Sequence, residues 1–444
     1  MTPRILKGFR DFLPDTAFAR QCLIRKLEKV FLSFGLSPID TPALEYADIL
    51  LGKGSEETDK QLYRFLDNGE RDVALRFDLT VPLARFAAMH LNELDLPFRR
   101  YHIAPVWRAE KPQKGRYREF MQCDFDIIGT ASAYADAEII AIIHSSLSAL
   151  SVKHRIRINN RSILNGFLES LGAKEHATHI LRAIDKLDKL GNNVVAEELS
   201  TNAGLDTSSI DKIFNFLSIS RGQCDNEEII SKLQSFLADS ELALQAVNEL
   251  DNLSGLLSAF SLGDEDYSFD LSIARGLDYY TGIVFETVCC DLPQIGSICS
   301  GGRYDNLASL YTKAKLPGVG ASIGLDRLLA ALEELHELSQ YKPSPEVLVT
   351  LMDDDCTHHS IKISHILREA GISTELFLEP NKKLASQLKY ADKKHFALVV
   401  IAGEREAEQH CCSIKDMRVG EQRDGVLLSE LVEVTKQMLE RVTA

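Results

Sequence analysis

The sequence predicts a multidomain α/β protein, in which an antiparallel-sheet core carries a helical insertion and a smaller α/β domain follows. At 444 residues, the chain is longer than one ordinary domain. Strand-like patterns fill residues 63–128 and return at 268–288 and 295–300, whereas residues 163–262 are rich in Leu, Ala, Lys and Glu at helical spacing. After residue 346, strand and helix patterns alternate, which is typical of a separate α/β domain.

The same changes of pattern predict the domain boundaries. We expect a core over residues 1–335, with the helical insertion at about 163–262. Residues 336–345 are expected to form a linker, because the segment YKPSPE is rich in proline and polar residues. The C-terminal domain is expected to span residues 346–444 and to contain a mostly parallel sheet.

The first half of the core is expected to begin with a helix. Apolar residues recur at helical spacing over residues 16–34, and the proline-containing segment 35–45 then favours an extended conformation. Residues 98–108 and 120–129 look like strands, and between them lies the charged segment 110–119. This arrangement predicts an antiparallel hairpin with a functional loop.

The remaining core elements follow from the same patterns. Residues 72–80 are expected to form a strand, residues 133–150 a helix and residues 154–160 a further strand. The segment SGGRYDN (300–306) is expected to be a loop. Residues 316–335 are expected to form a glycine-rich turn that leads into a strand and a helix.

The composition excludes some classes of protein. The 50 basic and 65 acidic residues give a net charge of −15, which argues against a nonspecific nucleic-acid binder but allows local basic patches. We find no apolar stretch long enough to span a membrane and no signal peptide, so a cytoplasmic protein is expected. The 9 cysteines are odd in number and form no C-x-x-C pair, which fits a reducing compartment and predicts no zinc site.

Five arginines stand in strand-rich or apolar surroundings: Arg108, Arg116, Arg118, Arg275 and Arg327. Each of them alone is explained more simply as a member of an ordinary ion pair or of a solvated surface. Together, their planar guanidinium groups suit phosphate oxygens and could clamp a triphosphate. The chain has no G-x-x-x-x-G-K-S/T loop and no G-x-G-x-x-G pattern, so ATP would have to be bound by another route.

Polar residues alternate along one predicted strand. Because alternate residues of a strand share a face, Gln122, Asp124 and Asp126 lie together. Their face is either an edge that meets water or the floor of a cavity for a polar ligand, such as an ammonium group or a ring N–H. Tyr279 and Tyr280 follow an arginine and an aspartate in RGLDYYTG, which favours a pocket that recognises a ring.

Six segments carry a resemblance to a known enzyme family. They are KGFRDFLP (7–14), GLSPIDTPALE (35–45), VWRAEKPQKGRYREFMQCDFDIIG (106–129), RGLDYYTG (275–282), SGGRYD (300–305) and GVGASIGLDRLLAAL (318–332). The second, third and last resemble motifs 1, 2 and 3 of class II aminoacyl-tRNA synthetases, and RGLDYYTG and SGGRYD resemble the signatures peculiar to histidyl-tRNA synthetases. The resemblance covers nearly the whole chain and implies a class II catalytic core with a C-terminal anticodon-binding domain.

The resemblance also implies the chemistry of the site, with ATP and its Mg²⁺ as substrate and no tightly held protein metal. Arg108 and Arg275 match the arginines at the α-phosphate and are the implied catalytic residues. The implied ATP-binding residues are Arg108, Glu110, Arg116, Phe120 and Arg327. The implied histidine-binding residues are Asp78, Leu79, Thr80, Arg108, Gln122, Asp126, Arg275, Tyr279 and Tyr280.

Within these sets the resemblance implies individual roles. Phe120 would stack on adenine and Arg327 would contact the γ-phosphate, whereas Asp126 and Tyr280 would read the imidazole. Some bacterial members carry Glu-Gly-Thr and a glutamate where this chain has Asp78-Leu79-Thr80 and Asp126, a pattern that is similar to the eukaryotic and archaeal branch.

The implied partners are L-histidine, ATP, tRNA(His) and a second copy of the chain, which would pair through motif 1. The C-terminal domain would read the anticodon. The basic residues expected to meet RNA are Arg99, Arg100, the four within residues 111–118, and Lys382, Lys389 and Lys393, which share a helical face by spacing.

Three other functions are compatible with parts of the sequence. A regulatory synthetase-like subunit of ATP phosphoribosyltransferase generally lacks the anticodon-binding domain and has a degraded RGLDYY signature, whereas both are intact here. A pseudo-synthetase module of a stress-sensing kinase would come with a kinase signature, which this chain lacks. The third is an enzyme that activates an amino acid but transfers it to an acceptor other than tRNA. Only an assay of the acceptor can distinguish this function from that of a synthetase.

Overall fold

The computed structural model divides the chain into two compact units, residues 1–341 and 342–444, and each is described by itself. Among the described residues, no helix is long and apolar enough to cross a membrane. The structure describes residues 2–51, 59–184, 186–222, 224–273, 279–341 and 346–441.

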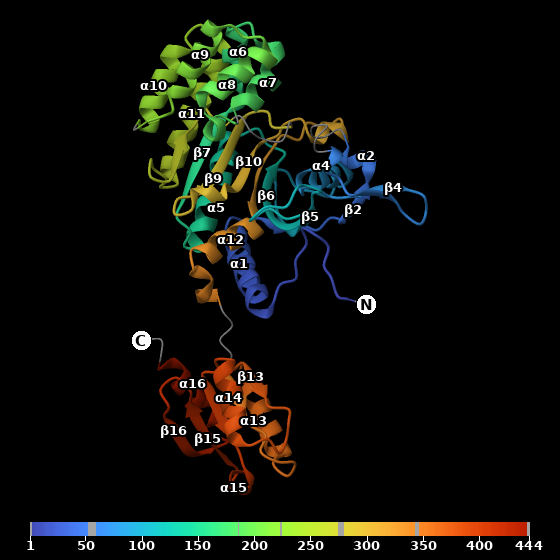
Figure 1. The fold of residues 1–444 in the computed structure, drawn as a ribbon, viewed down its shortest axis with the longest axis vertical. Helices are drawn as coiled ribbons and strands as arrows, with labels where there is room; N and C mark the ends of the chain where they lie inside the picture. The colour runs from blue at the N-terminus through green and yellow to red at the C-terminus, as the bar shows by residue number, and fades with distance from the viewer. Residues whose placement is uncertain are drawn as a thin grey trace. The chain divides into compact units, whose positions relative to one another are not determined.

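The first unit is built on an eight-stranded sheet with the order β1-β5-β6-β11-β10-β9-β7-β8 (Figure 1). Its strands are β1 (Ser37–Pro38), β5 (Phe98–Trp107), β6 (Glu119–Ile128), β7 (His154–Asn160), β8 (Tyr267–Phe269), β9 (Ile283–Cys289), β10 (Ser297–Arg303) and β11 (Gly318–Gly324). All pairings from β5 to β7 are antiparallel, and only the edge strands β1 and β8 pair parallel with their neighbours. The predicted antiparallel core is therefore confirmed.

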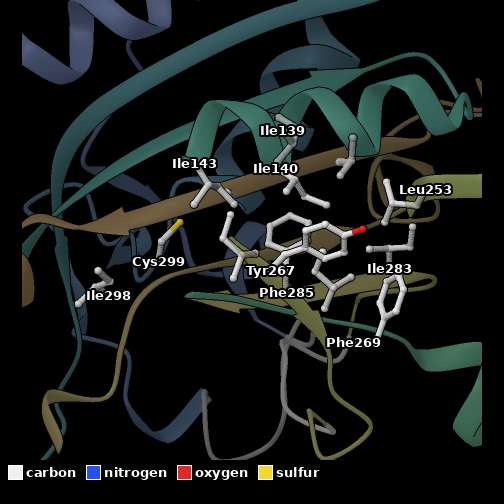
Figure 2. Packing of buried hydrophobic residues seen from close by; sticks show 14 of the residues in the cluster. Ile139, Ile140, Ile143, Leu253, Tyr267, Phe269, Ile283, Phe285, Ile298 and Cys299 are labelled. Atoms are coloured by element: carbon white, nitrogen blue, oxygen red, sulfur yellow. The ribbon is translucent and has the colours of Figure 1, made fainter. Parts of the chain in front are cut away.

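Three helices cover one face of this sheet: α1 (Pro14–Ser33), α5 (Ala133–Ala149) and α12 (Leu325–Glu334). Figure 2 shows Ile139, Ile140 and Ile143 of α5 pointing at the aromatic and aliphatic side chains of the sheet beneath. On β6, Phe125 belongs to this core, and its ring centroid lies 5.0 Å from that of Phe31 in α1. The other face of β6 is thereby left to its polar residues.

A small sheet with the order β2-β4-β3 stands beside the large one. It consists of β2 (Leu44–Tyr46), β3 (Arg64–Leu66) and β4 (Asp72–Leu75), followed by helix α4 (Thr80–Met89), and α2 (Ala47–Leu50) packs nearby. The predicted strand over residues 72–80 is thus too long. The chain leaves the strand at Leu75 because Asp78 Oδ1 accepts the backbone N–H of Val81, at 3.0 Å, and so satisfies one donor at the start of α4.

The helical insertion connects β7 to its parallel neighbour β8. It contains α6 (Arg161–Ser170), the 3₁₀ turn η1 (Lys174–His176), α7 (Ala177–Ile184), α8 (Leu187–Ala203), α9 (Thr207–Ser218), α10 (Asn226–Phe236) and α11 (Glu241–Ala259). Side chains of Asn160, Asp206, Asp225 and Ser240 cap four of these helices at their N-termini. Figure 1 shows the helices gathered in one cluster next to β7 and β9.

The segment predicted as a loop at 300–306 instead begins inside strand β10, which extends to Arg303. Its two glycines make this possible. A Cβ on Gly301 would lie 2.1 Å from the carbonyl oxygen of Gly320, and a Cβ on Gly302 would lie 2.7 Å from that of Ile283. The glycine pair therefore permits close approach of neighbouring strands rather than a turn.

The second unit contains a five-stranded sheet with the order β13-β12-β14-β15-β16. Its strands are β12 (Val347–Val349), β13 (Thr374–Leu376), β14 (Leu398–Ile401), β15 (Cys411–Asp416) and β16 (Gln422–Leu427), and its helices are α13 (Thr357–Glu369), α14 (Leu384–Lys393), α15 (Glu404–Glu408) and α16 (Leu431–Glu440). The prediction of a mostly parallel sheet holds only for β12, β13 and β14, which pair parallel, whereas β14–β15 and β15–β16 pair antiparallel. The connection between β15 and β16 is too short for a crossover helix, which forces the antiparallel pairing.

Candidate active site

The polar face of the large sheet holds two adjoining cavities, of about 140 Å³ and about 310 Å³. Both are built on β6, β10 and β11, where the antiparallel register brings Gln122, Ser300 and Ser322 into their walls. The residues that line both cavities are Arg108, Arg116, Gln122, Ser297, Ser300, Ser322 and Arg327. A ligand that fills one cavity would therefore share its boundary with a ligand in the other.

The first cavity gathers all five predicted ATP-binding residues. It is lined by Arg108, Glu110, Arg116, Phe120 and Arg327, together with Tyr117 and Asp326. The Arg108 Nε donates to the carbonyl oxygen of Phe77 at 2.9 Å, and its Cζ lies 5.1 Å from the centroid of the Phe120 ring. Glu110 lies between two cations, 4.0 Å from Arg108 Nη1 and 3.5 Å from Arg116 Nη1. Cationic forks beside an aromatic face suit a nucleotide with its phosphates.

Seven of the nine predicted histidine-binding residues line the second cavity: Asp78, Thr80, Arg108, Gln122, Asp126, Tyr279 and Tyr280. Leu79 does not line it, because its side chain is buried with Ala104 and Val106 in a small apolar cluster. Arg275 lies outside the described residues.

Each carboxylate of the second cavity already has partners from the protein. Tyr279 Oη donates to Asp78 Oδ2 at 3.3 Å, and Tyr304 Oη donates to Asp126 Oδ1 at 2.5 Å. The other oxygen of Asp126 lies 2.5 Å from Nη2 of Arg100, which is fully buried. These contacts hold the carboxylates in place, as a specific ligand site requires.

Three buried oxygens on the same strand have no hydrogen-bond donor among the described residues. They are Gln122 Oε1, Asp124 Oδ1 and Asp126 Oδ2, and the last of these is paired with Arg100 as an ion pair. The amide nitrogen of Gln122 donates to Ser322 Oγ at 2.8 Å, and Gln122 lines both cavities, so its oxygen is available as an acceptor for a ligand. Buried acceptors of this kind are costly unless a ligand or water donates to them.

Burial dominates the electrostatics of this region. It raises the pKa of Asp78 and of Asp126, against the opposing charges of Arg108 and Arg100, respectively. It raises the pKa of Asp124 to about 7, and the neighbouring Asp126 adds to the effect of burial. Three carboxyl groups thus share one low-dielectric region with the buried cations Arg76 and Arg100, and a cationic ligand group would favour their ionised forms.

Two interpretations of the sequence are corrected by this geometry. The stripe of Gln122, Asp124 and Asp126 is no water-exposed edge, since all three side chains are buried between β5 and β11. Arg100 is no RNA-facing residue, because it is fully buried against Asp126. Arg99 pairs with Glu138, with 2.6 Å between Nη1 and Oε2.

Three residues that surround Asp126 were not predicted from the sequence to belong to the site. Arg100 lies opposite Asp126 in the β5–β6 register, and Tyr304 follows the glycine pair of β10. Gly320 also lies opposite Asp126, where a Cβ would come within 1.9 Å of Asp126 Oδ1. Only the strand register, once known, could have identified Arg100 and Gly320.

Comparison with known proteins identifies the family. A family model described as histidyl-tRNA synthetase matches residues 8–328, and one described as anticodon binding domain matches residues 346–438. A histidine–tRNA ligase from Rhodopirellula baltica is 48% identical over 445 residues, covering 100% of this chain and 99% of its own length.

Solved structures agree with this result. The crystal structure of histidyl-tRNA synthetase from Nostoc sp. PCC 7120 matches with a TM-score of 0.86 at 34% identity, covering 98% of this chain and 99% of that one. An ATP phosphoribosyltransferase regulatory subunit/histidyl-tRNA synthetase from Bacillus halodurans matches with a TM-score of 0.74 at 24% identity, covering 87% of this chain and 96% of that one, and shows likeness of fold alone. The predicted class II fold with its anticodon-binding domain is confirmed, and the chain belongs to the histidyl-tRNA synthetase family.

Proposed function

We propose that this protein is a histidine–tRNA ligase, which activates L-histidine with ATP and transfers it to the 3′-terminal adenosine of tRNA(His). The observation that carries the proposal is the shared wall of the two cavities. Arg108 lines both of them, so a nucleotide in the first would place its α-phosphate beside the carboxylate of an amino acid in the second. Such positioning is a large part of what this reaction needs.

The first chemical step follows from this placement. One carboxylate oxygen of histidine attacks the α-phosphorus, the bond to the β-phosphate oxygen breaks, and pyrophosphate leaves. The attacking carboxylate is ionised at neutral pH, so no protein base is required. We assign Arg108 and Arg275 to the charge that develops at the α-phosphate, and Mg²⁺ enters with ATP as part of the substrate. In the second step, a ribose hydroxyl of the tRNA attacks the carbonyl carbon of the adenylate and AMP leaves.

The second cavity supplies the contacts for histidine itself. We assign Asp78, Thr80 and the free oxygen of Gln122 to the ammonium group, because all three offer acceptor oxygens and that of Gln122 has no donor among the described residues. Asp126 and Tyr280 are assigned to the imidazole, with Tyr279 shaping the wall. A substrate without these donors would leave buried groups unpaired, which discriminates by up to ~10⁴-fold.

The first cavity supplies the contacts for ATP. Phe120 offers its ring to adenine, Glu110 and Arg116 hold the nucleotide from the loop, and Arg327 faces the terminal phosphate. Arg327 is oriented by a hydrogen bond from its Nη1 to the carbonyl oxygen of Ser297. These assignments are supported by the presence of all these residues in one cavity wall.

We assign the tRNA anticodon to residues 346–444 and catalysis to residues 1–335, with the insertion at 163–262 and the linker at 336–345. Support comes from the anticodon-binding family model. Lys389 and Lys393 are exposed on α14, whereas Lys382 precedes that helix and lies 3.3 Å from Glu379, so the predicted three-lysine helical face is wrong. Attraction to RNA would come from the two helical lysines.

We further propose that the protein works in the cytoplasm as a homodimer. Leu44, Tyr46, Phe65 and Leu66 are exposed on β2 and β3, and large exposed apolar groups mark interaction surfaces. All nine cysteines are free, which fits a reducing compartment. Sedimentation of the purified protein would show a monomer if the dimer assignment were wrong.

Histidine-dependent exchange of pyrophosphate into ATP tests the proposed function directly. Exchange with histidine, and none with histidinol or the other amino acids, is the expected result. A charging assay with tRNA(His) then separates a tRNA ligase from an enzyme that uses another acceptor. A folded protein that binds histidine but supports no exchange with Mg²⁺ present would favour a regulatory relative instead.

A further inference from the structure

The N-terminal segment of residues 7–12 lies against the charged loop of residues 110–119. The backbone N–H of Arg118 donates to the Gly8 carbonyl at 2.9 Å, and its Nη1 donates to the Lys7 carbonyl at 3.3 Å. Gly8 has φ +89°, and a Cβ there would lie 2.8 Å from Arg118 Cδ. The backbone of the N-terminal segment at Gly8 therefore packs against the side chain of Arg118 in the loop, and only glycine allows this close approach.

Arg10 connects this segment to two walls of the first cavity. Its Cζ lies 3.2 Å from the centroid of the Tyr117 ring in the loop, and its Nη2 is paired with Asp326 Oδ1 at the start of α12. The other oxygen of Asp326 accepts the backbone N–H of Met121 at 2.6 Å. Tyr117 and Asp326 both line the cavity, so Arg10 stands behind its wall and joins the loop to the helix that carries Arg327.

The loop needs such external support. None of its described residues belongs to a buried hydrophobic cluster, and within the loop the backbone forms one isolated bridge, between Gln113 and Arg116. A charged loop with little burial opens at low free-energy cost. Contacts from Arg10 would reduce the freedom that the loop loses when it closes on a ligand.

We propose that residues 7–12 form a strap that holds the 110–119 loop in its ATP-binding conformation, and that Arg10 is its positioning residue. This inference rests on the proposed function only for its effect on ATP. The planar guanidinium stacks on Tyr117 and pairs with Asp326 at once, whereas the ammonium of a lysine could pair with Asp326 but has no plane to stack on the ring. Glu110 and Arg116 in the same loop then keep their positions at the cavity.

Arg10→Ala tests the strap by kinetics. We expect the KM for ATP in pyrophosphate exchange to rise about 10-fold, with the KM for histidine little changed, because the loop wall adjoins the nucleotide cavity. Arg4→Ala is the matched control, since Arg4 is an exposed arginine of the same terminal segment outside the strap. Arg10→Lys keeps a cation near Asp326 but loses the planar stack, so its KM for ATP should fall between those of the parent and Arg10→Ala.

Proteolysis tests the strap without any activity. Lys111 and Lys114 are exposed in the loop, so cleavage after them by a lysine-specific protease should be faster in Arg10→Ala than in the parent and in Arg4→Ala. Unchanged cleavage together with an unchanged KM for ATP, in Arg10→Ala or, if that variant does not fold, in Arg10→Lys, would overturn the inference. Equal rises of both KM values would also overturn it. If the parent shows no exchange, the proposed function fails and the cleavage rates alone decide on the strap.

Discussion

The two faces of strand β6 are both buried, yet they are built for different purposes. On one face, Phe125 and its neighbours Cys123 and Ile127 pack under α1 and α5 in a continuous apolar core. On the other, Gln122, Asp124 and Asp126 are also buried, but three of their oxygens have no hydrogen-bond donor among the described residues. The apolar face is complete without a ligand, whereas the polar face carries a cost that a bound ligand would relieve. Burial alone therefore does not tell a structural residue from a functional one.

The largest effect is expected on the apolar face. Phe125→Ala should lower the free energy of unfolding by about 3–5 kcal/mol, because it removes a fully buried ring and leaves a cavity. The remaining folded protein should bind histidine and ATP with unchanged KM values. Urea denaturation and exchange kinetics measure the two quantities. A raised KM with little loss of stability would erase the distinction between the faces.

Gly320→Ala attacks the polar face through its backbone. The added Cβ would lie 1.9 Å from Asp126 Oδ1, so the carboxylate would have to move. We expect kcat/KM for histidine in exchange to fall about 10²-fold while the KM for ATP changes little. Gly255→Ala is the control, because a Cβ at Gly255 meets no atom within 4 Å. Normal histidine kinetics in Gly320→Ala would show that the position of Asp126 is unimportant.

Gln122→Ala removes the free acceptor and should act mainly on binding. A hydrogen bond to a charged group contributes about 1.5–3 kcal/mol, so the KM for histidine should rise at least ~10-fold. Stability should change little, because among the described residues the amide makes one hydrogen bond, to Ser322. Gln234→Ala, at an exposed glutamine of α10, gives the comparison. A large loss of stability with a normal KM would place Gln122 with the structural residues.

The last prediction concerns the pH dependence of stability. The unfolded carboxyl of Asp124 ionises near pH 4, whereas in the folded protein its pKa is raised to about 7, so the folded state holds the proton more tightly. The resulting stability is fully present below the unfolded pKa and is lost as the pH rises to about 7. Asp124→Asn lacks this loss, so its stability relative to the parent should rise between pH 4 and 7 by up to about 1.4 kcal/mol per unit. Denaturation curves between pH 4 and 7 measure this change. A constant difference in the free energy of unfolding between Asp124→Asn and the parent would refute the raised pKa of Asp124.

Much of the fold could be read from local patterns. The strands around residues 98–107 and 154–160, the helix α5 and the helical insertion all show their own periodicity, because each has to match one buried face. Two predictions were wrong, the extra length of β4 and the loop at 300–306, because non-local features decide the structure at these positions. There, a helix start at Thr80 and close strand packing at Gly301 and Gly302 decide the structure, and neither leaves a periodic trace.

The sequence by itself determined the family and the residues that match its motifs, since those residues stand in short, ordered segments. Only the tertiary structure decided which of them meet. It brought most of the residues predicted to bind ATP and histidine into two adjoining cavities, with Arg108 in both. Leu79 instead lies in an apolar cluster. It also placed Arg100, Tyr304 and Gly320 against Asp126, and Arg10 behind the loop wall. Such contacts join residues many positions apart through strand register and packing, which local sequence patterns do not encode.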